Sequence, residues 1–329
     1  MMSLRSVGII GTGKYVPERV LTNADLEKMV DTSDEWIVTR TGIKERRIAA
    51  EHEATSDLAF HAAEKALQAA GITAEELDLI VVTTVTPDMA FPSTACLVQK
   101  RLGATKAAAF DLSAACSGFI YGLANVRNFI AMGTYKYALV IGAECLSRIT
   151  DYTDRNTCIL FGDGAGAAVL GPVPEGRGFQ SFVLGADGNG GELLKIEAGG
   201  SRMPASIETV EGKRHFLYMN GREVFKFAVR IMGNAAEEAL EKAGKKKEDI
   251  SLMIPHQANT RIIHAALERL NLSEDKCIIN LPYYANTSAA SIPLALAEAA
   301  EQGRIREGDT ILLVGFGGGL TWGASVIVW

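Results

Sequence analysis

The chain is 329 residues long, 48% of them hydrophobic and 22% charged, with a formal net charge of −6. This length allows one large or two medium globular domains, and the acidic balance argues against general binding of nucleic acid. The five cysteines are scattered, odd in number and form no CxxC pair, which argues against a disulfide framework and a zinc site. We therefore expect a cytoplasmic protein without a metal.

The first hundred residues predict alternating strands and helices. The elements expected there are strands at residues 7–11 and 77–84 and helices at residues 21–30 and 55–70. Thr55 or Ser56 is the expected cap of the longer helix, and Gly71 is its expected end. Residues 11–16 approximate a dinucleotide-binding fingerprint, but Val16 stands where the third glycine is needed, so cofactor binding is not expected there.

Cys116 lies where a predicted strand meets a predicted helix. Residues 107–110 indicate a buried strand, and residues 119–132 are apolar enough for a buried helix that ends at Gly133. Unpaired N–H groups at a helix N-terminus favour a thiolate, so we expect the pKa of Cys116 to be lowered. A lone buried cysteine is more often structural, and a nucleophilic role therefore depends on the rest of the chain.

Further strands are predicted in the second part of the chain, at residues 137–142, 250–255 and 278–281. Residues 310–329 carry no charge and could span a membrane by length alone, but five glycines interrupt them. Two buried strands joined by a glycine turn fit better, so no membrane association is expected. Residues 161–166 resemble a phosphate loop but lack its Lys-Ser/Thr ending, and residues 172–178 are the best linker candidate.

The two halves of the chain resemble each other. Residues 63–82 and 236–255 are identical at eight of twenty positions when they are aligned at an offset of 173. The same offset aligns residues 139–142 with 312–315 and places the Cys116 segment over residues 285–289. We infer a duplicated α/β fold of two mixed-sheet halves, residues 1–174 and 175–329, which are related by a pseudo-twofold axis in α-β-α-β-α layers.

This symmetry would bring the strand ends of both halves to one central site. His256 follows one predicted strand, and Asn286 follows another. Either residue alone would most often be structural. A thiol, an imidazole and a side-chain amide at one place, however, suit acyl transfer through a Cys116 nucleophile.

Three segments resemble the signature sequences of β-ketoacyl-acyl-carrier-protein synthase III, the thiolase-fold enzyme that begins bacterial type II fatty-acid synthesis. They are AACSGF at 114–119, PHQAN at 255–259 and NTSAAS at 286–291. Residues 31–37, 161–165 and 317–323 are similar too, so the resemblance covers nearly the whole chain. Ala285 departs from it, since glycine is frequent there, and the glycine-rich stretch 185–212 looks longer than in some relatives.

The resemblance implies two half-reactions without a metal or redox cofactor. Cys116 takes an acyl group from acyl-coenzyme A, while its own N–H and that of Gly318 hold the oxyanion. Malonyl-acyl-carrier protein then loses carbon dioxide, and His256 and Asn286 stabilise its enolate. The enolate attacks the acyl group on Cys116 and gives 3-ketoacyl-acyl-carrier protein.

The resemblance also implies a homodimer and further binding residues. The coenzyme A contacts would be Thr32, Trp36, Arg40, Arg155, Gly221 and Asn259; Phe91 would belong to the acyl pocket; and Lys226, Arg261 and Arg269 would dock the carrier protein. Which acyl primer is preferred does not follow from the sequence. Alternatives are another acyl-coenzyme A condensing enzyme of the same fold, or a non-catalytic acyl-coenzyme A binding protein. A degradative thiolase is disfavoured because residues 317–323 contain no second cysteine.

Overall fold

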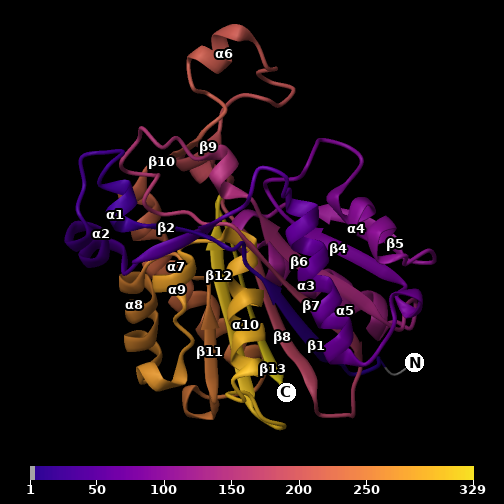
Figure 1. Cartoon of the computed structure of the whole chain (residues 1–329). Coiled ribbons are helices and arrows are strands. Elements are labelled where there is room, and N and C mark those ends of the chain that lie inside the picture. The colour runs from indigo at the N-terminus through magenta and orange to yellow at the C-terminus, as the bar shows by residue number, and fades with distance from the viewer. Residues whose placement is uncertain (1–3) are drawn as a thin grey trace.

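Two mixed β-sheets, one from each half of the sequence, form the frame of the computed structural model, which describes residues 4–329 (Figure 1). The first sheet has the order β1 (Val7–Tyr15), β7 (Gly164–Pro172), β6 (Ala138–Glu144), β4 (Leu79–Thr83), β5 (Ala108–Leu112). The second has the order β8 (Gly178–Ala186), β13 (Thr321–Val328), β12 (Thr310–Gly317), β11 (Leu252–Pro255). Two small ribbons pair β2 (Arg19–Thr22) with β3 (Glu45–Ile48) and β9 (Leu194–Ile196) with β10 (Leu217–Met219).

The two sheets repeat one topology, which confirms the duplicated fold. In the first sheet, β7 is antiparallel to its neighbours β1 and β6, and β6 is parallel to β4. In the second sheet, β13 is likewise antiparallel to its neighbours β8 and β12, and β12 is parallel to β11. The proposed boundary between residues 174 and 175 falls in the turn between β7 and β8. Residues 310–329 form the strand pair β12–β13 that their glycine pattern predicts.

The helices make three further layers around the sheets. The α-helices are α1 (Asn23–Leu26), α2 (Asp34–Thr41), α3 (Thr55–Ala70), α4 (Thr94–Leu102), α5 (Gly118–Ala131), α6 (Ile207–Glu211), α7 (Gly221–Lys242), α8 (Thr260–Leu270), α9 (Leu281–Tyr284) and α10 (Ser291–Glu301). The short 3₁₀ helices are η1 (Ala74–Glu76), η2 (Ala115–Ser117), η3 (Leu146–Ile149), η4 (Gly188–Leu193), η5 (Lys247–Asp249), η6 (Glu274–Lys276) and η7 (Ser288–Ala290).

The central layer consists of α5 and α10, and its core contains residues of both sheets. Both helices are largely apolar around their circumference, as expected of helices that are buried on all sides. The outer layers are amphipathic: α3 and α4 cover the first sheet, and α7 and α8 cover the second. Across residues 4–329, none of the helices combines the length and apolar character needed to cross a bilayer.

Four expectations about local structure are wrong. Residues 278–281 form no strand; Cys277 makes one isolated bridge with Met253, and α9 begins at Leu281. The expected helix 21–30 is helical only over α1. The cap of α3 is Ala54, because the hydroxyl of Thr55 donates instead to the carbonyl of Thr86.

The fourth concerns the strand before Cys116, which is not fully buried. Residues of β5 are half-buried or exposed because β5 is the edge of its sheet. Phe110 on this strand is 37% exposed. The unpaired side of β5 therefore remains available to another chain.

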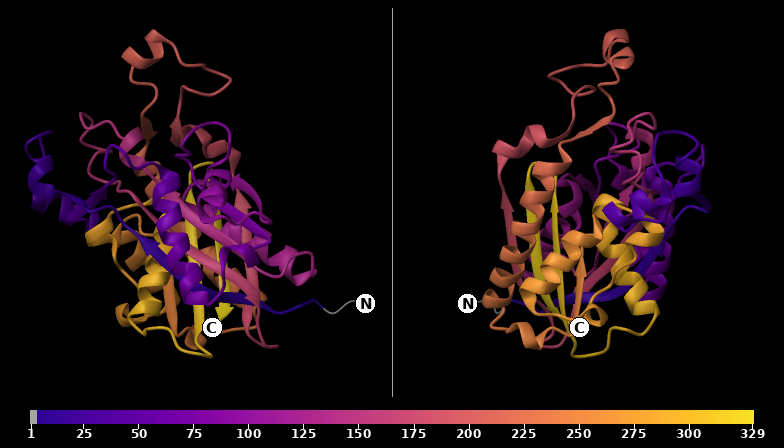
Figure 2. Two further views of the ribbon diagram at one scale, coloured as in Figure 1. Left: turned by 45° about the vertical axis from the view of Figure 1, so that its right-hand side comes forward. Right: turned by 90° about the vertical axis from the view of Figure 1, so that its left-hand side faces the viewer.

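One segment leaves the body of the molecule. Residues 197–216, here called the flap, connect β9 to β10 and carry α6. The flap stands away from the layers in all three views (Figures 1 and 2). Ile207 and Val210 on α6 are 79% and 62% exposed.

Candidate active site

Cys116 occupies a strained turn between β5 and α5. It lies in η2 and is buried, and the residue before it, Ala115, has a left-handed φ of 46°. The glycine turn at the end of β12, in the other half of the chain, lies directly against this loop. A Cβ atom on Gly317 would lie 2.6 Å from the backbone N of Cys116. Only glycine allows this approach, which keeps the backbone of both segments beside the sulfur.

The thiol of Cys116 is not predisposed to ionise. Burial raises its pKa to about 12, the nearby Ser288 hydroxyl lowers it, and the Glu144 carboxylate raises it further. The expectation of a lowered pKa is therefore wrong, because loss of water around a thiolate outweighs the lowering by Ser288 and by the backbone N–H of Cys116. Any reaction in which this sulfur acts as a nucleophile thus needs a group that takes the thiol proton.

His256 lies directly after β11 and is buried and neutral. Burial lowers its pKa to about 3. Its Nδ1 atom is 2.7 Å from the hydroxyl oxygen of Ser291, which also accepts the backbone N–H of Gln257 at 3.4 Å. We assign the Ser291 hydroxyl as the donor to Nδ1, which places the imidazole proton on Nε2, where it is a donor toward the cavity.

Asn286 is oriented by its own turn. Its Oδ1 atom accepts the backbone N–H of Ser288 at 2.8 Å. Its backbone bridges to the segment around Phe161, since Asn286 N donates to Leu160 O at 2.9 Å and Asn286 O accepts from Gly162 at 3.1 Å. With the amide oxygen occupied, the NH₂ group is the part left to act on a substrate.

One cavity of about 1130 Å³ brings these groups together. Its lining includes Cys116, His256, Asn286, Gly317 and Gly318. The same cavity reaches other residues that the sequence singled out: Trp36, Arg40, Gly221, Lys226, Asn259 and Arg261. Three catalytic candidates from different elements thus share one space with most of the predicted substrate contacts.

The indole ring of Trp36 lines one part of this cavity. Two guanidinium groups lie over the indole ring of Trp36, with Arg155 at 5.2 Å and Arg40 at 5.4 Å from the ring centroid. A second hollow of about 250 Å³ beside it is lined by Asp31, Thr32, Ser33, Trp36 and Arg155. Flat aromatic and guanidinium groups of this kind can stack on a base.

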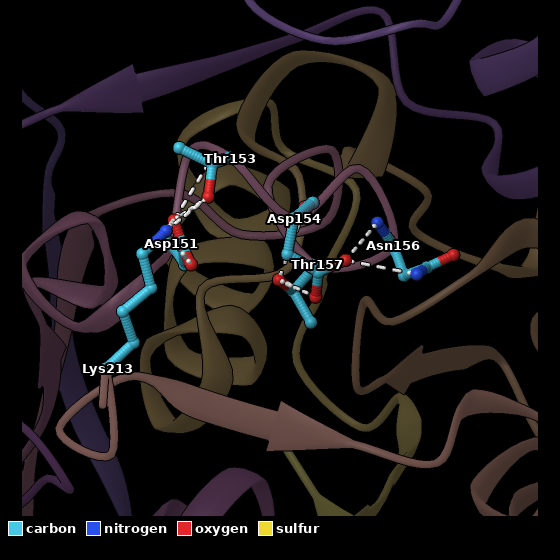
Figure 3. A network of polar contacts seen from close by, with 6 residues as sticks. All are labelled: Asp151, Thr153, Asp154, Asn156, Thr157 and Lys213. Atoms are coloured by element: carbon cyan, nitrogen blue, oxygen red, sulfur yellow. Dashed lines mark hydrogen bonds and ion pairs between the residues drawn. The ribbon is translucent and has the colours of Figure 1, made fainter. Parts of the chain in front are cut away.

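The loop that carries Arg155 is held by its own aspartates (Figure 3). Asp151 accepts from Thr153 N at 2.9 Å, and Asp154 accepts from Asn156 N at 3.0 Å. Lys213 of the flap reaches this loop and pairs with Asp151 at 3.0 Å. The flap is therefore tethered to the rim of the cavity.

Other predicted site residues lie apart or are already engaged. Phe91 is 85% exposed and does not line the cavity within one chain. Arg269 lies outside the lining and pairs with Glu237, with Nε 3.1 Å from Oε2. The Asn259 side chain caps α8 and donates to Arg40 O at 2.8 Å, which leaves its second amide hydrogen for a ligand.

Sequence reasoning missed three supporting side chains. Ser291 sets the tautomer of His256, and Ser288 lies beside the thiol. Thr321 ties the glycine turn to the nucleophile loop: its hydroxyl is 3.0 Å from Ala114 O and accepts from Ser117 at 2.8 Å. All three stand inside the signature segments, so their position was visible but their partners were not. No cluster of metal-ligating side chains occurs among residues 4–329.

Two family models match the chain. One, described as 3-oxoacyl-[acyl-carrier-protein] synthase III, matches residues 110–188, and the one for its C-terminal part matches residues 240–329. The chain is 62% identical over 324 residues to the β-ketoacyl-[acyl-carrier-protein] synthase III of Caldanaerobacter subterraneus, covering 98% of both. It is 59% identical to the enzyme of that name from Geobacillus kaustophilus, again covering 98% of both.

A solved structure has the same fold. The β-ketoacyl-[acyl-carrier-protein] synthase III of Thermus thermophilus superposes with a TM-score of 0.92 at 57% identity, covering 98% of this chain and 99% of that one. At this similarity the two chains share one fold over nearly their whole length.

Proposed function

The chain belongs to the β-ketoacyl-acyl-carrier-protein synthase III family, and we propose that it performs the family's condensation through Cys116, His256 and Asn286. It is an acyltransferase that joins an acyl-coenzyme A primer to malonyl-acyl-carrier protein, the initiating condensation of fatty-acid synthesis. The observation that carries the residue assignment is the single cavity lined by all three side chains and by the glycine turn.

In the first half-reaction, Cys116 attacks the thioester carbonyl of the primer. A new S–C bond forms, the bond to the coenzyme A sulfur breaks, and the thiol proton leaves Cys116. The developing oxyanion is held by the backbone N–H of Cys116 and by that of Gly318 in the glycine turn. The close approach of Gly317 to Cys116 supports this assignment, because it brings the two backbone segments together.

In the second half-reaction, malonyl-acyl-carrier protein loses carbon dioxide. The enolate oxygen that forms needs fixed donors in a dry site. His256 supplies its Nε2–H, and Asn286 supplies its amide N–H. The enolate carbon then attacks the acyl carbonyl on Cys116 and releases the 3-ketoacyl product. Decarboxylation drives the new carbon–carbon bond, and we propose that no cofactor takes part.

Coenzyme A binds in the outer part of the cavity. Its adenine stacks between Trp36 and Arg155, with Thr32 and Arg40 beside it. Gly221 and Asn259 contact the pantetheine arm, which leads from the rim to Cys116. Trp36 and Arg40 line the cavity, and Arg155 lines the hollow beside it, which supports this position for the base. The Arg155 guanidinium lies 5.2 Å from the indole centroid, too close for a base between them, so this side chain moves aside to admit the adenine.

The carrier protein docks beside the same mouth. Lys226 and Arg261 line the cavity and are the main contacts, whereas Arg269 contributes less because it is paired with Glu237. The enzyme works in the cytoplasm as a homodimer, in which the exposed edge β5 meets its copy. Phe91, exposed in one chain, would then be free to reach an acyl pocket of the partner.

Mass spectrometry tests the nucleophile. After incubation with acetyl-coenzyme A, an acetyl group is expected on the peptide that contains Cys116. Cys96 is the internal control, because it is the exposed cysteine of the chain's five. A Cys116→Ala variant should take up no acetyl group. Acetylation of Cys96 instead, or binding of acetyl-coenzyme A without acylation and release of coenzyme A, would refute the proposal.

A further inference from the structure

Glu144 is a fully buried acid that the half-reactions above do not use. It ends β6 and has an exposed fraction of 0%. Its carboxylate accepts from the hydroxyls of Thr84 at 3.1 Å and Thr86 at 2.6 Å, and from the backbone N–H of Val85 at 3.2 Å. Among residues 4–329, no basic side chain forms an ion pair with it. A buried, unpaired acid is costly and calls for a reason.

Ser288 connects this acid to the nucleophile. Its hydroxyl is buried and, among residues 4–329, makes no hydrogen bond of ordinary geometry. The 3₁₀ helix η7 that carries Ser288 packs against both η2, which holds Cys116, and β6, which ends at Glu144. In this position the hydroxyl also lowers the pKa of both groups. A hydroxyl with no other partner on this loop can accept from the thiol and donate to the carboxylate once its side chain turns toward them.

The duplication explains how this line of three groups arose. At the offset of 173, Ser288 corresponds to Ala115. Both residues have a left-handed backbone conformation, with φ of 48° and 46°. Glu144 likewise corresponds to Gly317, each near the end of an equivalent strand. Gly317 meets the loop of Cys116, and the end of β6 meets the matching loop of the other half, η7. In the half that carries Cys116, the loop η2 contacts Gly317 through its backbone. In the other half, the equivalent loop η7 carries the hydroxyl of Ser288.

The reaction has a need that these groups can meet. The thiol proton of Cys116 must go somewhere, since burial keeps the thiol protonated at neutral pH. His256 carries a proton on Nε2 because its Nδ1 faces Ser291, so it is a donor toward the cavity. Glu144 is the acid whose charge acts on the Cys116 thiol.

We propose that Glu144 is a positioning residue that holds the Cys116 proton, through the Ser288 hydroxyl, while the enzyme is acylated. As the S–C bond forms, the thiol proton passes to Ser288 and the Ser288 proton passes to Glu144. Coenzyme A leaves as a thiolate and takes a proton from solvent. When the enolate attacks and the S–C bond breaks, both protons move back and restore the thiol. This inference rests on the proposed acylation of Cys116.

The surroundings of Glu144 suit such a role. Burial raises its pKa to about 7, so the carboxyl can take up and release a proton near neutrality. The titratable groups that interact with it are the thiols of Cys116 on η2 and Cys145 just after β6. Thr84, Thr86 and Ser288, which face it from the other elements, do not titrate.

The test measures coenzyme A release from acetyl-coenzyme A in a single turnover across pH 5.5–9. In the parent, the acylation rate should rise with pH through about 7, because the carboxylate is the accepting form. Glu144→Gln should lose that inflection and be slower at pH 7 by about a hundredfold, with KM for acetyl-coenzyme A unchanged. Ser288→Ala should behave alike, and the double variant should be no slower than the slower single one.

Glu298→Gln is the matched control, a half-buried carboxyl on α10 that binds Asn280 and Lys14 away from the cavity. It should keep the parent's pH profile. Parent-like acylation by Glu144→Gln and by Ser288→Ala would overturn the relay, as would multiplied losses in the double variant. Ser288→Ala alone decides if Glu144→Gln fails to fold. A parent that is never acetylated on Cys116 would instead refute the proposed function.

Discussion

Ala285 has a backbone conformation that glycine would adopt more easily. Its φ of 56° and ψ of −157° lie in a region populated almost entirely by glycine. The turn must bend there because Asn286, the next residue, bridges to Leu160 and Gly162. The alanine that departs from the family signature is therefore a strained position that the surrounding contacts enforce.

Ala285→Gly should stabilise the fold. Relief of strain should add about 1 kcal/mol to the free energy of unfolding, after the extra chain entropy of glycine is subtracted. Thermal unfolding monitored by circular dichroism measures it as a higher midpoint. Ala239→Gly, in the middle of α7, is the control and should lower the midpoint by a comparable free energy. If both variants lower it, Ala285 is not strained.

His256 should not titrate over the working pH range. Its folded pKa of about 3 lies below the ordinary 6.5, so the imidazole stays neutral and keeps its Nε2–H well below pH 6. Decarboxylation of malonyl-acyl-carrier protein should therefore show no inflection near pH 6.5, which carbon dioxide release from the acetylated enzyme measures. The free energy of unfolding should fall as pH drops below 6.5, because the histidine is protonated in the unfolded chain but stays neutral in the folded one. A rate that halves at pH 6.5 would contradict the buried, neutral assignment.

Among the elements, α7 and α8 combine a structural and a binding role. Their inner faces cover the second sheet, while their first turns border the cavity. Lys226 pairs with Glu223 at 2.7 Å, and Arg261 lies 4.8 Å from the centroid of Phe225. Arg269 is about 12 Å further along α8 at the helical rise per residue. The proposed docking charge is thus concentrated at the beginning of these helices.

Reversing that charge should affect one half-reaction only. Lys226→Glu with Arg261→Glu should raise the KM for malonyl-acyl-carrier protein at least tenfold and leave acylation by acetyl-coenzyme A nearly unchanged. Exposed charges steer encounter and are screened by salt, so the parent's KM for the carrier protein should rise with salt. Arg269→Glu is the comparison and should have a smaller effect. Equal loss of both half-reactions would mean that the charges support the fold or the channel.

The elements also show where sequence patterns are sufficient. Long apolar or amphipathic segments such as α3 and β12–β13 were predictable, because their periodicity reflects burial in one layer. The strand expected at residues 278–281 failed because its sequence is short and apolar, and a turn with an isolated bridge buries it equally well. The exposure of β5 could not be predicted, since a strand's place in its sheet depends on the order of all the others.

For the whole molecule, the internal repeat made it predictable that the three candidate catalytic residues share one cavity. The symmetry placed Cys116, His256 and Asn286 at one point before any contact was known. It could not place Glu144 or Ser288, because their roles depend on side-chain approach across the axis. The exposure of Phe91 and of the flap was beyond sequence reasoning too, since it depends on how far each segment stands from the rest of the fold.

A second copy of the chain should cover the β5 edge. Phe110→Glu would place a charge on this strand, so it should shift the protein from dimer to monomer at micromolar concentration. Light scattering coupled to size exclusion reports the mass. Phe129→Glu is the control, because Phe129 is similarly exposed, at 38%, but lies on α5 outside the edge strand. A monomeric parent would refute the homodimer, and a dimeric Phe110→Glu variant would place its interface elsewhere.

The position of the glycine turn late in the chain has a consequence during synthesis. Gly317 and Gly318 close the cavity over Cys116, yet they are translated some two hundred residues after it. A nascent chain that is still short of β12 lacks the glycine turn of the proposed oxyanion site and the strand that pairs with β11 before His256. If the proposed roles hold, a product truncated before β12 should carry an unreactive Cys116 thiol.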